Sequence, residues 1–305
     1  MGNVISNVSH PQFDLGSGVR GGIAPSSGGF APNRPAGLTN VLDRQWSSAD
    51  NTIMAAFDEV TQDSAGMVWA DEAGYAEPTV AASPTSYGIV APPDSATEVL
   101  RVRYPANYTQ GRTPFKMYKQ GGLGEGNTKY YHACYVYWPA SFDMAGNNLK
   151  WLWFAQGSTP SSNHLFMMSA NNKGSYVGPW SALQNSANAN LGGGNRTANM
   201  GPIVTQNSPQ GANPDNGYWD AQAGKWTLVE WYVEEETVPG VSNDGIFKAW
   251  SDDVLICHYD EVQFNMGGGF RTLNLAPYYG GGGLANGPAS NQDLFIGRFL
   301  VATAS

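Results

Sequence analysis

Short segments in which apolar and polar residues alternate, separated by Gly, Pro, Asn and Asp, make up most of the chain after residue 65. They are rich in β-branched and aromatic residues, a composition that favours β-strands. We predict strands near residues 66–70, 86–91, 98–104, 113–120, 129–138, 149–156, 163–169, 174–178, 226–235, 245–250, 254–260 and 293–302. The one helix candidate covers residues 48–58. Many short strands without intervening helices predict an all-β sandwich or jelly roll.

Two polar clusters mark turns between predicted strands. Asn243-Asp244-Gly245 precedes the strand at 245–250, and Ser251-Asp252-Asp253 follows it. Asn, Asp and Gly tolerate the positive φ angles that tight hairpin turns require. We therefore expect antiparallel hairpins in this part of the chain.

Two long segments lack any such periodicity. Residues 1–45 are rich in Gly, Pro, Ser and Asn, and residues 181–224 show hardly any apolar pattern. We predict an extended N-terminal arm over 1–45 and a sandwich domain over 46–305 that contains the long loop 181–224. A segment with the arm's composition cannot bury a core of its own, so we expect it to pack on other protein subunits.

Composition and charge narrow the function classes. Only 13% of the 305 residues are charged, 12% are aromatic, and the formal net charge is −9. The chain has no apolar run of about 18 residues, so no membrane span is expected. It also lacks the basic cluster that binding to nucleic acid requires. Its first residues have neither the basic nor the apolar region of a signal peptide.

The two cysteines do not form a disulfide framework. Cys134 and Cys257 lie in apolar, strand-like segments and belong to no metal-ligand spacing. We expect two buried thiols rather than a bridge.

Aromatic residues in two predicted strands suit the recognition of sugars. The strand at 129–138 carries His132 among tyrosines, and the strand at 149–156 carries Trp151 and Trp153 on one face. Side by side, these strands would form a sheet face that offers rings to sugar C–H groups and polar atoms to sugar hydroxyls. Aromatic residues also fill sandwich cores, so part of this set is expected to be buried.

Histidines and glutamates are the candidates for acid–base chemistry. His132 and His164 are possible general bases or sugar contacts, although a strand histidine also serves structural roles. Glu230 and Glu234 offer a pair of carboxylates for glycoside hydrolysis, which is a weaker alternative.

Oxygen ligands for calcium gather near the hairpins. Asn243, Asp244, Asp252 and Asp253 supply them, but turn formation explains these residues without a metal. No cofactor is expected.

Four segments resemble a known enzyme family in the same order along the chain. They read EVLRVRYPANYTQG (98–111), YYHACYVYWPASFDMAGNNLKWLWF (130–154), GKWTLVEWYVEEETVPGVSNDGIFKAWSDDVLI (224–256) and LAPYYGGGG (275–283). Together they resemble the concanavalin-like polysaccharide lyases, the group that contains alginate, glucuronan and heparin lyases. The resemblance implies a concanavalin-like jelly roll that holds a polysaccharide in the groove of a curved sheet.

The same resemblance implies site residues. Lyases of this family remove the proton next to a uronate carboxylate with Tyr or His, and they neutralise the carboxylate with Arg, Gln, Asn or Lys. For a lyase, the implied catalytic residues are Lys150, His132, His164 and Tyr176. The implied glycan-binding residues are Tyr118, Trp151, Trp153, Gln156, Trp180, Tyr278 and Tyr279.

Two departures from the family pattern favour binding without turnover. The strand at 163–169 is apolar where the family carries an Arg, and Lys150 is followed by Trp-Leu-Trp-Phe instead of Leu-Pro-Gly-Leu. The leading hypothesis is a glycan-binding or structural sandwich, such as a capsid decoration or tail-associated protein of a phage virion attached through residues 1–45. We therefore expect a virion or extracellular location. The alternative is an active lyase that cleaves a uronate-containing polymer by β-elimination.

Overall fold

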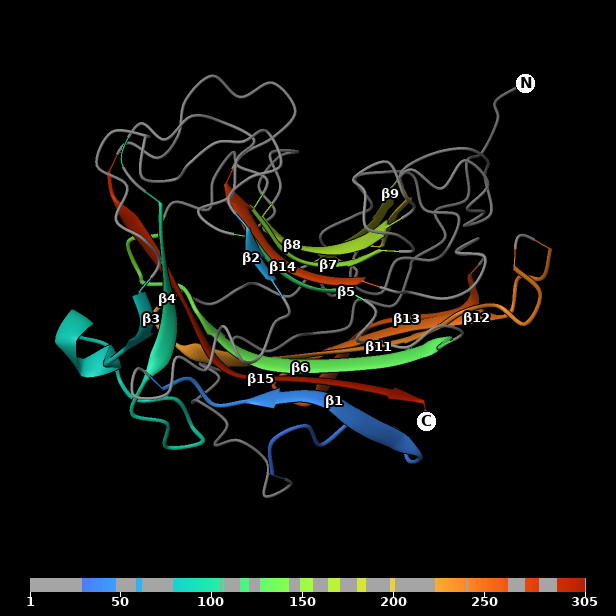
Figure 1. The fold of residues 1–305 in the computed structure, drawn as a ribbon, viewed down its shortest axis with the longest axis horizontal. Coiled ribbons are helices and arrows are strands. Elements are labelled where there is room, and N and C mark those ends of the chain that lie inside the picture. Colours follow the sequence, from blue (N-terminus) through green and yellow to red (C-terminus); the bar gives the residue numbers. More distant parts are fainter. Residues whose placement is uncertain are drawn as a thin grey trace, which may run out of the picture.

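Two antiparallel β-sheets stack face to face in the computed structural model (Figure 1). The structure describes residues 29–47, 59–61, 79–104, 106, 116–120, 127–142, 149–155, 164–170, 180–184, 198–200, 223–239, 241–262, 272–279 and 290–304. The predicted all-β sandwich is confirmed. No helix in the described part of the chain is long and apolar enough to cross a membrane.

The eight-stranded sheet forms one layer. Its order is β13 (Val254–Val262), β12 (Gly245–Ser251), β11 (Trp226–Glu234), β6 (Lys129–Tyr137), β15 (Gln292–Ala304), β4 (Val99–Tyr104) and β3 (Thr79–Ala82). The long strand β15 also pairs with β1 (Leu38–Arg44). β6 lies between β11 and β15 and pairs with both along most of its length.

The seven-stranded sheet forms the other layer. Its order is β10 (Ala198–Met200), β9 (Trp180–Gln184), β8 (His164–Ala170), β7 (Leu149–Ala155), β14 (Thr272–Tyr279), β5 (Lys116–Gln120) and β2 (Glu59–Thr61). This sheet is curved, and its concave side faces away from the eight-stranded sheet (Figure 1).

Most strands predicted from alternation are present. Those near 98–104, 113–120, 129–138, 149–156, 163–169, 226–235, 245–250, 254–260 and 293–302 are confirmed, with ends shifted by a few residues. The strand predicted near 86–91 is wrong. A 3-10 helix, η2 (Pro84–Tyr87), lies there because Pro84 starts the turn and Gly88 ends it at φ 72°. The predicted helix 48–58 and the strands 66–70 and 174–178 lie outside the described residues.

Both segments predicted to lack regular structure contain strands. β1 falls within residues 1–45 and is hydrogen-bonded to the C-terminal strand β15, so the described part of this segment belongs to the sandwich. β9 and β10 fall almost entirely within 181–224 and extend the seven-stranded sheet. Residues 1–28, 185–197 and 201–222 lie outside the described residues.

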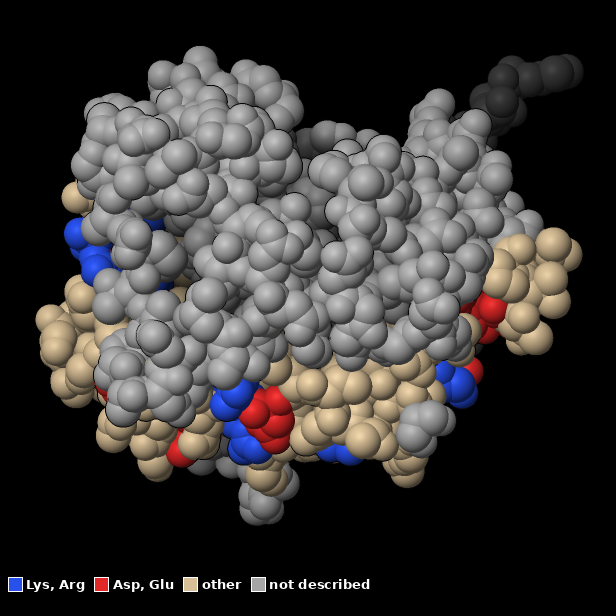
Figure 2. Space-filling view, in the orientation of Figure 1, with Lys and Arg blue, Asp and Glu red and all other residues tan. Residues whose placement is uncertain are grey.

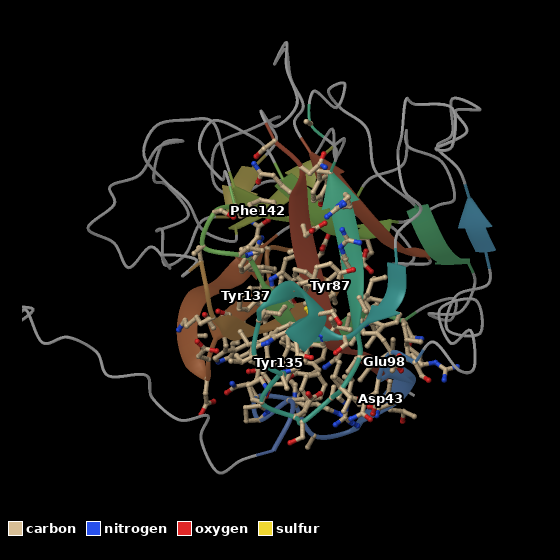
Figure 3. All side chains as sticks on the ribbon, turned by 90° about the vertical axis from the view of Figure 1, so that its left-hand side faces the viewer. Asp43, Tyr87, Glu98, Tyr135, Tyr137 and Phe142 are labelled. Atoms are coloured by element: carbon tan, nitrogen blue, oxygen red, sulfur yellow. The ribbon has the colours of Figure 1, made fainter. Side chains whose placement is uncertain are left out.

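The eight-stranded sheet is packed on both faces. Its outer face carries Tyr131, Tyr135 and Tyr137 in one cluster with Leu38 of β1 and with Ile89, which follows η2. The inner face, turned toward the seven-stranded sheet, carries the fully buried Cys134, a free thiol as expected, together with the other inner-face residues Tyr130, His132, Val136, Trp231, Phe247 and Phe299. Figure 3 shows how densely side chains surround this sheet.

The turn between β12 and β13 has the predicted hairpin form. Asp252 and Asp253 both have positive φ, 48° and 67°, and Ser251 pairs with Val254 to close the turn. The Asp252 carboxylate offsets the conformational cost by accepting hydrogen bonds from the Leu228 backbone N–H (2.9 Å) and from Lys225 Nζ (3.0 Å). The hairpin is thereby tied to the start of β11.

Candidate functional site

The backbone register of the seven-stranded sheet collects most of the predicted site residues. Residues paired on neighbouring strands share a face of a sheet, so each chain of pairs defines a row across it. The first row runs Tyr278–Lys150–Met168–Trp180 over β14, β7, β8 and β9. Three of its four members were predicted from the sequence.

Two further rows lie beside the first. The second runs Glu59–Tyr118–Asn274–Trp153–Phe166–Ala182–Asn199 across all seven strands. The third runs Gln120–Thr272–Ala155–His164–Gln184. Tyr118, Trp153 and His164 were predicted, and they take neighbouring register positions on this sheet.

A β-bulge determines the row of Lys150. Strict alternation along β7 would group Lys150 with Leu152 and Phe154 and separate it from Trp153. The pairing with β8 shifts on both sides of Lys150, and the pairing of β7 with β14 shifts between Leu275 and Tyr278. Bulges redirect residues in this way at functional sites. The bulge brings Lys150 into register with Met168, and therefore onto the face of the other two rows.

Several predicted residues stand outside the three rows. Tyr279 pairs with Leu149, and Trp151 lies at the bulge without a register partner. Gln156 and Tyr176 lie outside the described residues.

His132 does not join this site. It lies on β6 in the eight-stranded sheet, so β6 and β7 are not the neighbours that the sequence analysis expected. The ring is fully buried between Phe299 and Trp231, at centroid distances of 4.7 and 6.5 Å. Its Nδ1–H donates to the Leu300 carbonyl (2.8 Å). Burial lowers the pKa of His132 to about 3, so the ring is neutral and acts as part of the core.

No protein-family profile and no curated protein matches the sequence. The fold, in contrast, matches solved structures of polysaccharide lyases. The alginate lyase Aly36B, solved with an alginate trisaccharide, has a TM-score of 0.53 and 11% identity over 85% of this chain and 96% of its own. The PL-14 alginate lyase from Aplysia kurodai has a TM-score of 0.53 and 14% identity over 87% and 99%. The endo-β-1,4-glucuronan lyase from the fungus Trichoderma reesei has a TM-score of 0.53 and 12% identity over 87% and 96%.

The chain has a polysaccharide-lyase-like jelly-roll fold. The fold class implied by the sequence motifs is thereby confirmed. At these identities the likeness is one of fold and does not extend to the chemistry of the site.

The glutamates considered for glycoside hydrolysis do not form a catalytic pair. Glu230 is fully buried on the outer face of β11, and its carboxylate accepts hydrogen bonds from Tyr131 and Asn33. Glu234 lies four residues further along the same strand, roughly 13 Å away at the rise of a β-strand, which exceeds the spacing that hydrolases use. It forms an ion pair with Lys129 (2.7 Å) and accepts a hydrogen bond from Tyr232.

The carboxylates considered for calcium are engaged by protein donors. Asp244 accepts hydrogen bonds from the Thr237 backbone N–H and from the hydroxyls of Thr237 and Ser242, and these bonds lower its pKa to about 2. Asp252 accepts hydrogen bonds from the Leu228 backbone N–H and from Lys225, and Asp253 accepts one from the Asn33 side chain. Among the described residues, no three His, Cys, Asp or Glu side chains gather in a metal-binding group.

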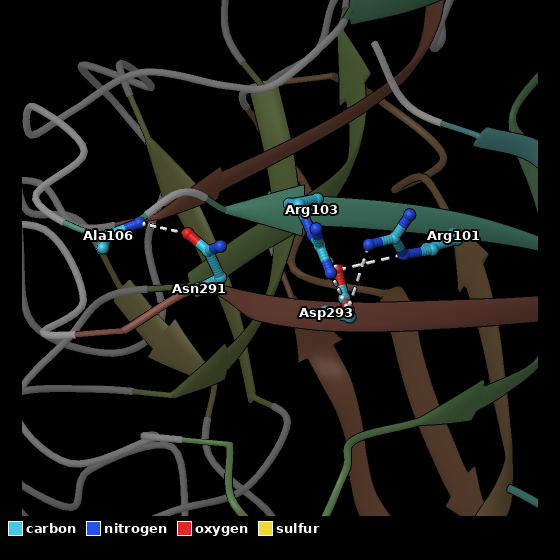
Figure 4. A network of polar contacts seen from close by, with 5 residues as sticks. All are labelled: Arg101, Arg103, Ala106, Asn291 and Asp293. Atoms are coloured by element: carbon cyan, nitrogen blue, oxygen red, sulfur yellow. Dashed lines mark hydrogen bonds and ion pairs between the residues drawn. The ribbon is translucent and has the colours of Figure 1, made fainter. Parts of the chain in front are cut away.

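Two arginines of the eight-stranded sheet are also engaged within the fold of the lyase-like sandwich. Arg101 and Arg103 on β4 both bind Asp293 of β15, at 3.1 and 2.9 Å, as Figure 4 shows. The Arg101 guanidinium also stacks on the Tyr87 ring at 4.5 Å. On the face drawn in Figure 2, the described basic side chains stand in scattered groups, some of them beside acidic ones.

The rows also contain polar residues that the sequence analysis missed. Asn274 and Thr272 lie on β14, while Gln120 and Gln184 lie at the ends of the third row. The alternation in Thr272-Leu273-Asn274-Leu275 is a strand signal that would have located the first two. The amides of Asn and Gln are suited to hydrogen-bond sugar hydroxyls and carboxylates.

Proposed function

We propose that this protein binds a polysaccharide along the face of the seven-stranded sheet that carries the three rows. The observation that supports the proposal is the register, which gathers Lys150, Trp180 and Tyr278 in one row and Tyr118, Trp153 and His164 in the two rows beside it. Six predicted residues from distant segments of the sequence thus take neighbouring positions on one sheet.

The residue types in these rows suit a polysaccharide that carries carboxylates. Aromatic rings stack on the apolar faces of sugars, amides bond to hydroxyls, and a lysine offers a positive charge to a uronate. The fold neighbours add weight, because one of them was solved with an alginate trisaccharide and another is a glucuronan lyase. The chain's net charge of −9 makes a local cation such as Lys150 the more important for an anionic ligand.

Affinity electrophoresis against alginate, glucuronan and heparin-like polymers tests the proposal. Retardation by at least one polymer is expected, and Lys150→Ala and Trp153→Ala should each weaken it about tenfold or more. Lys129→Ala is the matched control, since it removes the same charge from the eight-stranded sheet. If Lys150→Ala and Lys129→Ala reduced the retardation equally, the overall charge of the protein rather than the three rows would govern binding.

A second candidate function is cleavage of the bound polymer by β-elimination. The observation that favours it is the direct register pairing of Tyr118 with Asn274, one row from Lys150. A tyrosinate oxygen would remove the proton next to the uronate carboxylate while an amide or ammonium stabilises the negative charge on that carboxylate. The C–O bond to the leaving sugar then breaks, a double bond forms in the uronate, and the leaving oxygen takes up a proton.

Near-ultraviolet absorbance of the unsaturated product distinguishes cleavage from binding. A steady rise with a polymer that is bound, abolished in Tyr118→Phe while binding is retained, would establish the lyase. Binding without any rise would establish a binding protein. Release of reducing ends without absorbance would point instead to hydrolysis.

Attachment to a larger assembly such as a virion stays a prediction. Removing residues 1–45 would delete β1 and expose the edge of β15, so that deletion does not test attachment cleanly. Deleting only residues 1–28 leaves β1 in place, and the shortened protein should fold but fail to join the assembly.

A further inference from the structure

Residues 29–37, here called the strap, cross the outer face of the eight-stranded sheet before β1 begins. Phe30 and Ala31 pack against the apolar cluster of that face, and the Phe30 ring lies 5.5 Å from the Tyr135 ring. The Arg298 guanidinium covers the Phe30 ring at 4.5 Å. These side chains are only partly buried, so apolar contact alone holds the strap weakly.

One buried carboxylate holds the middle of the strap. Glu230 of β11 is 0% exposed, and its two oxygens accept hydrogen bonds from Asn33: the backbone N–H donates to Oε1 (3.0 Å) and Nδ2 donates to Oε2 (2.9 Å). Tyr131 of β6 also donates its hydroxyl hydrogen to Oε1. Burial, and then the nearby Glu230 charge, raise the pKa of Tyr131, which keeps that hydroxyl protonated as a donor. Hydrogen bonds to a charged acceptor are the strong ones in proteins.

A third contact fixes the orientation of the Asn33 amide. Its Nδ2 also donates to Asp253 Oδ1 (2.8 Å) in the β12–β13 hairpin. Turning the amide over would place its oxygen against two carboxylates, Glu230 and Asp253. Asn33 of the strap therefore bonds to a pair of carboxylates, one on β11 and one in the β12–β13 turn.

The chain that follows the strap is held by the sheet, and Arg34 of the strap also donates to the Leu38 carbonyl and to Asn40 Oδ1 (2.6 Å). Gly37 has φ 83°, a conformation that other residues rarely adopt, and nothing lies within 4 Å of the place its Cβ would take. From Leu38 onward the backbone pairs with β15, and Arg298 clamps Asp43 with two hydrogen bonds of 2.9 Å. An opening that ends at Gly37 would leave the β1–β15 pairing intact, but it would also have to release the Arg34 contacts that span Gly37.

We propose that the strap is a latch that opens and closes as a unit, with the Glu230 carboxylate as its catch and Gly37 as its hinge. In the open state the latch uncovers the tyrosine-rich outer face around Tyr131 and Tyr135, on the side of the eight-stranded sheet that faces away from the seven-stranded sheet. This inference does not depend on the proposed function.

Hydrogen exchange of the full-length protein, followed by mass spectrometry, tests the latch. In the wild type, amides of residues 29–37 should exchange through an opening with little denaturant dependence, while amides of β6 and β11 exchange only on global unfolding. Glu230→Gln replaces an acceptor by a donor that faces Asn33. Exchange in the strap should accelerate about tenfold or more and keep its weak denaturant dependence. Exchange in β6 and β11 should accelerate only by the loss of global stability and keep its strong denaturant dependence.

Two further variants, one at the strap and one control on β11, complete the test. Asn33→Ala removes both hydrogen bonds of Nδ2, to Glu230 and to Asp253, while the backbone N–H still donates to Glu230. It should also accelerate strap exchange. Glu234→Gln is the matched control, because it makes the same change on the same strand at a carboxylate that Lys129 holds, and it should leave strap exchange unchanged. Strap amides that exchange as slowly as β6 in the wild type, or that stay unchanged in both catch variants, would overturn the latch.

Discussion

The two sheets of the sandwich divide structure and chemistry between them. The eight-stranded sheet uses its polar residues internally: His132 is neutral in the core, Glu230 holds the strap, and Asp293 joins two arginines across β4 and β15. The seven-stranded sheet places Lys150 and His164 in rows with aromatic and amide residues. The same residue types therefore stabilise the fold on one sheet and, under the proposed function, contact the ligand on the other.

We therefore expect the largest loss of stability from substitutions of buried residues in the eight-stranded sheet. Trp231 is 2% exposed and packs edge-on against Phe247 at 5.7 Å. Trp231→Ala should lower the free energy of unfolding by about 3–5 kcal/mol, measured by chemical denaturation. Trp153→Ala on the seven-stranded sheet should cost clearly less stability and should lose polysaccharide binding instead. Equal destabilisation by the two changes would remove the distinction between the sheets.

The pH dependence of stability tests the structural role of His132. Its folded-state pKa is about 3 against an ordinary value of 6.5, so between these values the unfolded chain binds a proton that the folded protein does not. Stability from the neutral ring is complete above pH 6.5 and falls as the pH decreases toward 3, by about 1.4 kcal/mol per pH unit. His132→Gln should flatten this part of the profile measured by urea denaturation. An unchanged slope in the variant would assign the acid sensitivity to other groups.

A smaller effect is expected at the link between β4 and β15. Asp293 carries the charge that separates Arg101 from Arg103, and Arg101 is largely buried. Asp293→Asn leaves two guanidinium groups facing each other and should cost about 2 kcal/mol. Thermal unfolding would show it as a lower Tm with polysaccharide binding intact. If Asp293→Asn lost polysaccharide binding at an unchanged Tm, a ligand contact would lie on the eight-stranded sheet, contrary to the proposed site.

The smallest effect is expected at the Lys129–Glu234 ion pair. The two side chains are 43% and 26% exposed, so solvent screens their 2.7 Å contact. Glu234→Gln should change the free energy of unfolding by less than about 1 kcal/mol. If Glu234→Gln lowered the free energy of unfolding as much as Asp293→Asn does, the expected order of the two effects would be wrong.

Alternation located the strands whose two faces differ clearly, but it could not decide which face of a strand looks inward. His132 shares its face with Cys134 and Val136, which suits a core or a groove equally well until β6 is placed in a sheet. β1 was missed because the Gly- and Pro-rich sequence around it masks the short apolar pattern Leu38–Leu42, and it gains its stability from pairing with β15.

The candidate site illustrates a different limit. The residue types near Lys150 indicated a sugar-binding face, yet strict alternation separates Lys150 from Trp153. Only the bulge, a property of how β7 pairs with its neighbours, brings them to the same face. The partner residues Asn274 and Gln184 come from strands that no pattern near Lys150 could reveal, because cross-strand pairing is non-local.

Hydroxyl-radical footprinting with bound oligosaccharide tests the central claim most directly. Alginate, glucuronan and heparin-like oligosaccharides are each added, and the oxidation of individual Trp and Tyr side chains is compared with the free protein. With at least one of them, Trp153, Trp180 and Tyr278 should be protected, while Trp250 at the outer face of the eight-stranded sheet keeps its reactivity. Protection of Trp250 with no change at Trp153, Trp180 and Tyr278 would place the ligand on the other sheet and contradict the proposed site.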